Sequence, residues 1–273
     1  MNVFLSKLLD LICRNLRRLY SLQEFLEFHR LVSQVFSFYP AINTPFKSQW
    51  ENTINSSVKG FRAPLLAGQN AITAEVLKEF RYSYDAGQVL KNKWPYKHTP
   101  DLWNVGLTRI ALAGTKRETV AMDYNVLYGQ CNGEFNPTNS GECKTINDEL
   151  LKYFEKQTYV SYVQAFLKNY YGNRAPLSIG HHFSLWNKGV YWKALQKFVL
   201  DVCQLPEVKC ITHIELVEWM EAQNVRWGNT FFNKMNQGMF SKTDIPSTPK
   251  DVLKTDLEPL DKKVNYKLSM MVP

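Results

Sequence analysis

Two adjacent histidines, His181 and His182, are the side chains of this sequence best placed for acid–base chemistry. They follow the apolar run 177–180, and α/β folds hold reacting groups at the carboxyl ends of such strands. A histidine also exchanges its proton near neutral pH, which suits a general acid or base. His213 lies in the alternating run 209–215, which predicts a strand in which this histidine is a packing or surface residue.

An arginine and two aspartates occupy similar positions beside predicted strands. Arg62 precedes Pro64 near the end of one such run, where a guanidinium can hold a carboxylate or orient a substrate oxygen. Asp85 and Asp123 each adjoin a tyrosine, which suits charge pairing with Arg62 or a polar rim around a sugar. Each has a structural alternative: an exposed arginine before a turn, or an aspartate that caps one.

Aromatic residues make up 14% of the chain and supply planar faces of the kind that stack on sugar rings. The rings considered for this role are Trp186, Tyr191, Trp192, Trp94 and Trp103. Most tryptophans in a domain of this size belong to the core, so only a minority of these rings is expected at a binding surface.

Four of the five cysteines form two close pairs along the sequence. Cys131 and Cys143 bracket a loop rich in Gly, Asn and Pro, and Cys203 and Cys210 bracket a shorter one. A disulfide can close each loop locally, and neither pair has the C-x-x-C spacing of a zinc site. Two local disulfides would indicate an oxidising compartment, and the spacing leaves open the alternative of five free thiols in a cytosolic protein.

The composition excludes several classes of partner. The formal net charge is +8, but the 33 Lys and Arg residues are spread along the chain, so no nucleic-acid partner is expected. No uninterrupted apolar run reaches about 18 residues, so we expect no transmembrane segment. Residues 1–20 alternate apolar and charged positions at helical spacing, which predicts an amphipathic helix and no signal peptide.

The order of elements predicts an α/β architecture with a largely parallel sheet or open barrel. Strand-like runs are expected at 58–66, 82–87, 102–112, 118–128, 175–186 and 209–215. Helices are expected at 74–80, capped by Thr73, at 146–171 as one helix or two, at 190–204 and at 215–226. We expect three regions, namely amphipathic helices at 1–44, a globular domain at 45–237 and a polar, extended tail at 238–273.

The order of several motifs resembles the polysaccharide deacetylase family, also called the NodB-homology family. The motifs are GFRAPLLAGQN, then YSYDAG, then WP, then AMDYN, and finally RAPLSIGHHFSLWNKGVYWKAL followed by T-x-x-E-L-x-x-W. The resemblance spans roughly residues 45–225 and corresponds to the second half of a family domain. The combination of RAPLL with IGHH is its most specific feature.

This resemblance implies a distorted (β/α) barrel that removes N-acetyl or O-acetyl groups from chitin, peptidoglycan or xylan, with zinc or another divalent metal. Arg62 would match the arginine that orients the catalytic aspartate. His181, or alternatively His182, would match the histidine that protonates the leaving amine. The substrate groove would include Pro64, Leu65, Asp123, Tyr124 and Trp186. Because extracellular family members carry local disulfides in comparable loops, the resemblance also implies an exported or cell-surface protein.

The chain departs from this family in its metal-binding motifs. Neither Thr-Phe-Asp-Asp nor His-x-x-x-His occurs in the 273 residues, and metal-assisted hydrolysis needs the cation. We therefore expect a truncated or divergent member with an incomplete barrel, an added N-terminal helical segment, no bound metal and no activity of the chain alone. A noncatalytic module that binds a sugar polymer or another partner is the main alternative, and a merely structural fragment is the third.

Overall fold

The structure is a computed structural model that describes residues 57–63, 66, 70–136, 138–182, 184–227, 230–237 and 253. The helices predicted within 1–44 lie outside these residues, as do Pro64, Leu65 and the tail predicted at 238–273 except for Leu253. Among the described residues, no helix is long and apolar enough to cross a membrane.

Three small sheets form the β part of the described residues. The first has the strand order β1-β2-β5-β4, with bounds Gly60–Phe61, Tyr84–Asp85, Leu102–Asn104 and Tyr96–Thr99. The second has the order β3-β6-β7, with bounds Val89–Leu90, Leu107–Ala111 and Glu118–Val120. The third is the hairpin of β8 and β9, with bounds Phe135–Asn136 and Asn139–Cys143. The pairs β1–β2, β2–β5 and β3–β6 are parallel, and the others are antiparallel.

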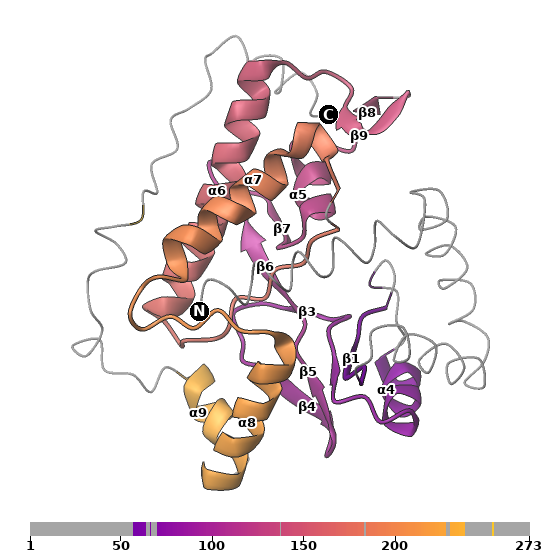
Figure 1. Cartoon of the computed structure of the whole chain (residues 1–273), viewed down its shortest axis with the longest axis vertical. Coiled ribbons are helices and arrows are strands. Elements are labelled where there is room, and N and C mark those ends of the chain that lie inside the picture. The colour runs from indigo at the N-terminus through magenta and orange to yellow at the C-terminus, as the bar shows by residue number, and fades with distance from the viewer. Residues whose placement is uncertain are drawn as a thin grey trace.

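Six helices of the described chain cover these sheets (Figure 1). Their bounds are Asn70–Glu79 for α4, Asp123–Gln130 for α5, Asp148–Tyr170 for α6, Trp186–Val202 for α7, His213–Trp227 for α8 and Phe231–Asn236 for α9. The long helices α6 and α7 lie side by side and contact each other extensively. The pair α8 and α9 occupies the opposite end of the view.

Helix α6 is one uninterrupted helix, which settles the alternative of one helix or two. Asn147 caps it by accepting a hydrogen bond from the Leu150 backbone N–H at 2.8 Å, and acidic residues in the first turn favour the positive end of the helix dipole. Its buried face includes Tyr162 and Val163, which pack with α7 residues and Leu253 in one apolar cluster. This cluster anchors the middle and the end of α7, through Ala194, Phe198 and Val202.

The α/β class is confirmed at this coarse level, but the described residues form several short sheets and no closed barrel. A barrel requires every strand to pair on both sides. Here β1 and β4 are the two edges of the first sheet. The finer assignment to a deacetylase-type barrel therefore stays a prediction.

The strand predicted at 118–128 is wrong in its second half, where α5 begins at Asp123. The aromatic and branched residues of this segment favour a strand locally. In the folded chain Val126, Leu127 and Gln130 are buried together at helical spacing, because tertiary packing overrides local propensity.

Three other local predictions are corrected. Thr73 lies inside α4, which begins at Asn70, so it does not cap that helix. The described residues between 175 and 185, which exclude residue 183, contain no strand beyond one isolated parallel bridge at Gly180. The strand predicted at 209–215 is absent because α8 begins at His213. There, Thr212 and Glu215 exchange side-chain and backbone hydrogen bonds at 2.7 and 3.3 Å as a capping box, which starts a helix.

Two glycines offer a matched test of how tightly the sheets are packed. A Cβ at Gly106 would overlap the Gln88 carbonyl oxygen, whereas a Cβ at Gly129 in α5 would meet only Leu112 Cδ2 at 3.6 Å. We expect Gly106→Ala to lower the free energy of unfolding by about 2 kcal/mol or more. Gly129→Ala should raise it by about 0.5 kcal/mol, since alanine is the better helix former. Urea denaturation monitored by circular dichroism measures both, and equal effects would contradict the close approach at Gly106.

Candidate functional site

The backbone brings the predicted site residues together from three distant segments. The Gly180 backbone N–H donates to the Ala121 carbonyl at 2.8 Å, and Met122 and Gly180 form a parallel bridge. This register places Asp123 beside the two histidines. A Cβ at Gly180 would lie 2.6 Å from Arg62 Nη1, so the guanidinium lies directly against the glycine backbone. Gly180 thus allows Arg62 to join the same cluster.

The Asp123 carboxylate is the centre of this cluster and its side chain is 0% exposed. Its Oδ1 accepts hydrogen bonds from the Tyr124 backbone N–H at 2.8 Å and from His182 Nδ1 at 2.6 Å. Its Oδ2 accepts one from the His182 backbone N–H at 2.8 Å and lies 3.2 Å from His181 Nδ1. A buried carboxylate needs such donors to remain ionised. Its place in the first turn of α5 adds the favourable end of a helix dipole.

These contacts determine where the proton of His182 lies. A carboxylate oxygen only accepts hydrogen bonds, so Nδ1 of His182 must be the donor and carry a proton. In the neutral ring, Nε2 is then the unprotonated nitrogen. It lies on the far side of the ring from Asp123, and it is the atom that can exchange a proton with a bound molecule. An aspartate that orients a histidine in this way is a recurrent arrangement in acid–base catalysis.

The two histidines differ in their access to a ligand. The His181 side chain is 4% exposed, whereas that of His182 is 43% exposed. Burial lowers the pKa of His181 below its usual value, although the Asp123 charge opposes this shift. Since a proton donor must reach its substrate, the geometry favours His182 over His181 for that role.

Arg62 extends the cluster towards the first sheet. Loss of water around the guanidinium lowers the pKa of Arg62, and the nearby Asp123 and Tyr84 groups oppose that shift. Burial raises the pKa of Tyr84, against the effect of Arg62. Of the two aspartates predicted as charge partners of Arg62, Asp123 is therefore the one that interacts with it electrostatically. Asp85 instead accepts a hydrogen bond from the Gly87 backbone N–H at 2.7 Å.

Two aromatic rings lie next to His182, which is itself partly exposed. The Trp186 ring centroid lies 5.2 Å from that of His182 and 5.5 Å from that of Tyr124, and Tyr124 is 41% exposed. We refer to His182, Tyr124 and Trp186 as the His182 surface. Two rings at an exposed imidazole are suited to hold a flat, partly apolar molecule such as a sugar.

A second polar contact beside Arg62 involves Ser178 and His213. Ser178 Oγ lies 3.0 Å from His213 Nε2. Burial, with a smaller effect of Arg62, lowers the pKa of His213 to about 4. A ring with that pKa is a weak base at neutral pH, so this pair does not activate the serine as a nucleophile.

Sequence reasoning identified most of the cluster but not all of it. Tyr191, Trp94 and Trp103 are buried, so these candidates for sugar stacking belong to the core. Pro64 and Leu65 lie outside the described residues. Gly180 and His213 were missed as neighbours of Arg62. A glycine between an apolar run and two histidines is a signal for a close backbone approach, whereas His213 carried no comparable signal.

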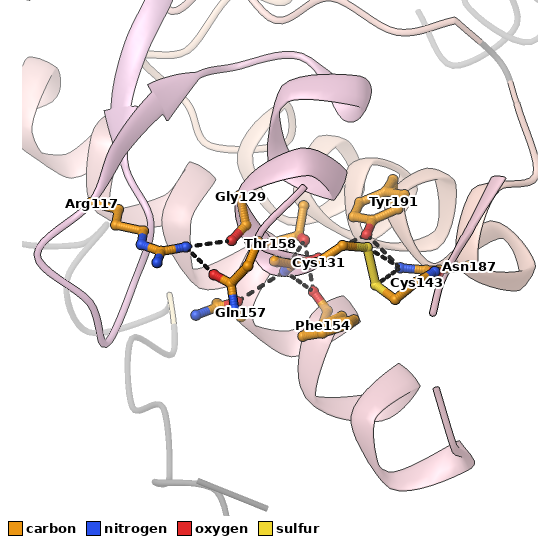
Figure 2. The surroundings of a disulfide bond; sticks show 11 residues. Arg117, Gly129, Cys131, Cys143, Phe154, Gln157, Thr158, Asn187 and Tyr191 are labelled. Atoms are coloured by element: carbon orange, nitrogen blue, oxygen red, sulfur yellow. Dashed lines mark hydrogen bonds between the residues drawn. A yellow bond between two sulfur atoms is a disulfide. The ribbon is translucent and has the colours of Figure 1, made fainter. Parts of the chain in front are cut away.

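Both predicted cysteine pairs are bonded in the structure. Cys131 and Cys143 form one disulfide and Cys203 and Cys210 the other, with Cα–Cα distances of 5.1 and 5.6 Å. The Cys131–Cys143 bond joins the end of α5 to the end of β9, next to the start of α7 (Figure 2). Disulfides of this kind are compatible with an extracellular location.

The pair of Asp123 Oδ1 and His182 Nδ1 has the spacing of a hydrogen bond and not that of two zinc ligands. Two ligands of one tetrahedral zinc ion, each about 2.1 Å from it, lie about 3.4 Å apart. His182 Nδ1 and Asp123 Oδ1 are 2.6 Å apart, which is a hydrogen-bond distance. Within the part of the chain that the structure describes, no group of three or more His, Cys, Asp or Glu side chains is arranged to hold a metal ion.

The depressed pKa of His213 predicts a pH-dependent stability. The unfolded chain takes up a proton at this residue near pH 6.5, whereas the folded chain does so only near pH 4. The free energy of unfolding should therefore fall as the pH falls from about 6.5 to 4, by about 2–3 kcal/mol from this residue. Urea denaturation across this range should show a shallower fall for His213→Gln than for the unchanged protein. Parallel curves would show that His213 is not kept neutral by burial.

The four contacts to Asp123 predict a large effect of removing its charge. In Asp123→Asn an amide NH₂ would face at least one N–H donor, and we expect a loss of about 2–3 kcal/mol in the free energy of unfolding. Asp148→Asn is the control, because that side chain is 91% exposed and lies 3.8 Å from Lys188 Nζ. It should change stability by less than about 0.5 kcal/mol. Equal stability of the two variants at pH 7 would contradict the role of Asp123 as an ionised centre.

Comparison of the chain with protein-family models, with curated proteins and with solved structures found no match.

Proposed function

We propose that this chain is a polysaccharide deacetylase-like protein that binds an acetylated polysaccharide at the His182 surface and does not hydrolyse it by itself. The observation that carries the proposal is the convergence of Arg62, Asp123 and His182 from three segments that are far apart in the sequence. These residues lie in the motifs on which the family resemblance rests. Their proximity is what that resemblance requires.

The pair of Asp123 and His182 supports a role for His182 as the acid of such a site. Asp123 fixes the ring so that Nε2 faces away from the carboxylate. When protonated, Nε2 can donate to the nitrogen or oxygen atom of an acetylated sugar, and Asp123 stabilises the resulting charge on the ring. His181 is less suited to be this acid, because its side chain is only 4% exposed and packs beside the Asp123 carboxylate.

The aromatic rings support a sugar as the bound molecule. Trp186 and Tyr124 lie at centroid distances of 5.2 and 6.5 Å from His182, so an imidazole and two aromatic rings border one small surface. A pyranose ring has an apolar C–H face and polar edges, and an aromatic ring beside hydrogen-bonding groups matches both. The family resemblance implies which sugar this would be, namely an acetylated polymer of the chitin, peptidoglycan or xylan type.

The absence of Thr-Phe-Asp-Asp and His-x-x-x-His from the 273 residues supports binding without hydrolysis. Hydrolysis in this family uses a divalent cation to polarise the acyl carbonyl and to activate water. An acid such as His182 contributes only part of the rate enhancement. The two disulfides further support an exported or cell-surface protein, since such bonds persist in oxidising compartments.

Titration with acetylated sugar oligomers tests this proposal directly. Chitin hexamer, acetylated xylan fragments and soluble peptidoglycan fragments should be added to the purified chain while tryptophan fluorescence is recorded. Released acetate should be measured in parallel, with and without added zinc. We expect binding of at least one oligomer at micromolar to millimolar Kd and no acetate release. Removal of the Trp186 ring in Trp186→Ala should weaken that binding about tenfold or more.

Trp219→Ala provides the control for this experiment. Trp219 is also a partly exposed tryptophan, at 41%, but it lies on α8, at the other end of the molecule from α5 and the β8–β9 hairpin (Figure 1). Its variant should bind the oligomer as the unchanged chain does. Zinc-dependent acetate release would overturn the claim that the chain is inactive alone. Failure of every oligomer to bind would overturn the proposal as a whole.

A further inference from the structure

Asn187, the second residue of α7, is tied to the Cys131–Cys143 disulfide by several contacts (Figure 2). Its Oδ1 accepts a hydrogen bond from the Cys143 backbone N–H at 3.0 Å. Its Nδ2 lies 3.3 Å from Cys143 Sγ and 4.0 Å from Cys131 Sγ, and donates to the Tyr191 hydroxyl at 2.8 Å. The side chain is 0% exposed. Both the oxygen and the nitrogen of its amide group therefore have partners within the protein.

The backbone at Asn187 has a conformation that needs support. Its φ and ψ are 46° and 48°, and Lys188 and Gly189 share this left-handed region. Side chains other than glycine rarely adopt it, and asparagine does so more readily than most. Three such residues in a row turn the chain sharply at the start of α7. The buried contacts of Asn187 hold this turn in place.

The network continues from Asn187 across to α5. The Tyr191 hydroxyl donates to Gln130 Oε1 at 2.8 Å, and Gln130 Nε2 donates to Gln157 Oε1 at 2.9 Å. Gln157 Nε2 then donates to the Ala113 carbonyl at 2.8 Å. Burial raises the pKa of Tyr191, which keeps its hydroxyl protonated as a donor. The disulfide and this chain of hydrogen bonds join the end of α5 to the first two turns of α7.

Both joined helices begin at or next to residues of the His182 surface. Helix α5 begins at Asp123, which holds His182, and α7 begins at Trp186, immediately before Asn187. Trp186 also packs on the β9 strand, since a Cβ at Gly141 would lie 2.7 Å from Trp186 Cδ1. The position of Trp186 relative to His182 is therefore set by the contacts of Asn187 and of the strand that ends at Cys143.

We infer that Asn187 is a positioning residue that couples the Cys131–Cys143 disulfide to the His182 surface. When the disulfide is formed, Asn187 holds Trp186 against His182. When the disulfide is broken, the contacts of Asn187 no longer fix the start of α7 relative to the strand that ends at Cys143. The sugar-binding consequence rests on the proposed function. The coupling between the disulfide and the Trp186 ring does not.

Glycine substitution separates the side chain of Asn187 from its backbone conformation. Asn187→Gly keeps the left-handed turn accessible but removes every contact of the amide. Lys188→Gly is the matched control, because Lys188 has the same conformation, at φ 57°, with a side chain that is 62% exposed. The first readout is the NMR resonance of the His182 Cε1–H group, which is sensitive to the ring of Trp186. It is assigned by its loss in His182→Gln. The second is the Kd for the sugar oligomer that the unchanged chain binds.

We expect Asn187→Gly to move the His182 resonance and to weaken sugar binding about tenfold, while Lys188→Gly changes neither. The double variant Cys131→Ala/Cys143→Ala should give the same shift, and adding Asn187→Gly to it should cause little further change. Cys203→Ala/Cys210→Ala is the control for loss of a disulfide elsewhere. All spectra should be recorded on samples that circular dichroism shows to be folded.

The outcomes separate the two proposals. An unchanged His182 resonance in a folded Asn187→Gly variant would show a purely structural role and overturn the coupling. Additive effects of Asn187→Gly and the cysteine variant would overturn it as well. If the unchanged chain binds no oligomer, the proposed function fails, while the resonance still decides whether Asn187 links the disulfide to Trp186.

Discussion

The buried charge of Asp123 is the constraint on which the candidate site depends. A carboxylate at 0% exposure is tolerated only if donors replace the lost water. Backbone N–H groups of Tyr124 and His182 and the ring of His182 provide them. These donors come from the first turn of α5 and from the segment after Gly180. The ionised form of Asp123 therefore requires the start of α5 and the segment after Gly180 to lie side by side. The same hydrogen bonds fix the orientation of the His182 ring.

The packing of the long helices is what keeps this arrangement rigid. Helices α6 and α7 form a large apolar cluster, and the start of α7 is linked to α5 by a buried disulfide and a chain of hydrogen bonds. Buried polar networks of this kind are stable only when every member has a partner. The position of Trp186 next to His182 thus depends on buried residues that lie outside the His182 surface. Asn187 contacts the disulfide at the Cys143 backbone N–H and at both sulfur atoms.

Local sequence patterns predicted the long elements well and the short ones poorly. The periodicity of 146–171 and 190–204 predicted α6 and α7, because a helix of many turns repeats its apolar face several times. The short segment that became α5 carried residues that favour a strand, and only burial of Val126 and Leu127 decided the outcome. At α8 the sequence holds two conflicting signals: the alternation in 209–215 favours a strand, whereas Thr212 and Glu215 form a capping box that starts a helix.

The sequence by itself determined which side chains are available for chemistry: an arginine before a proline, an aspartate beside a tyrosine, two histidines after an apolar run, and cysteines in close pairs. These are properties of residue type and short spacing. The tertiary structure decided that Asp123 joins Arg62, that His182 is the exposed histidine, and that Asn187 connects the disulfide to Trp186. These outcomes depend on burial and on contacts between distant segments. Neither is encoded in local spacing, because both arise only when the chain excludes water from its interior.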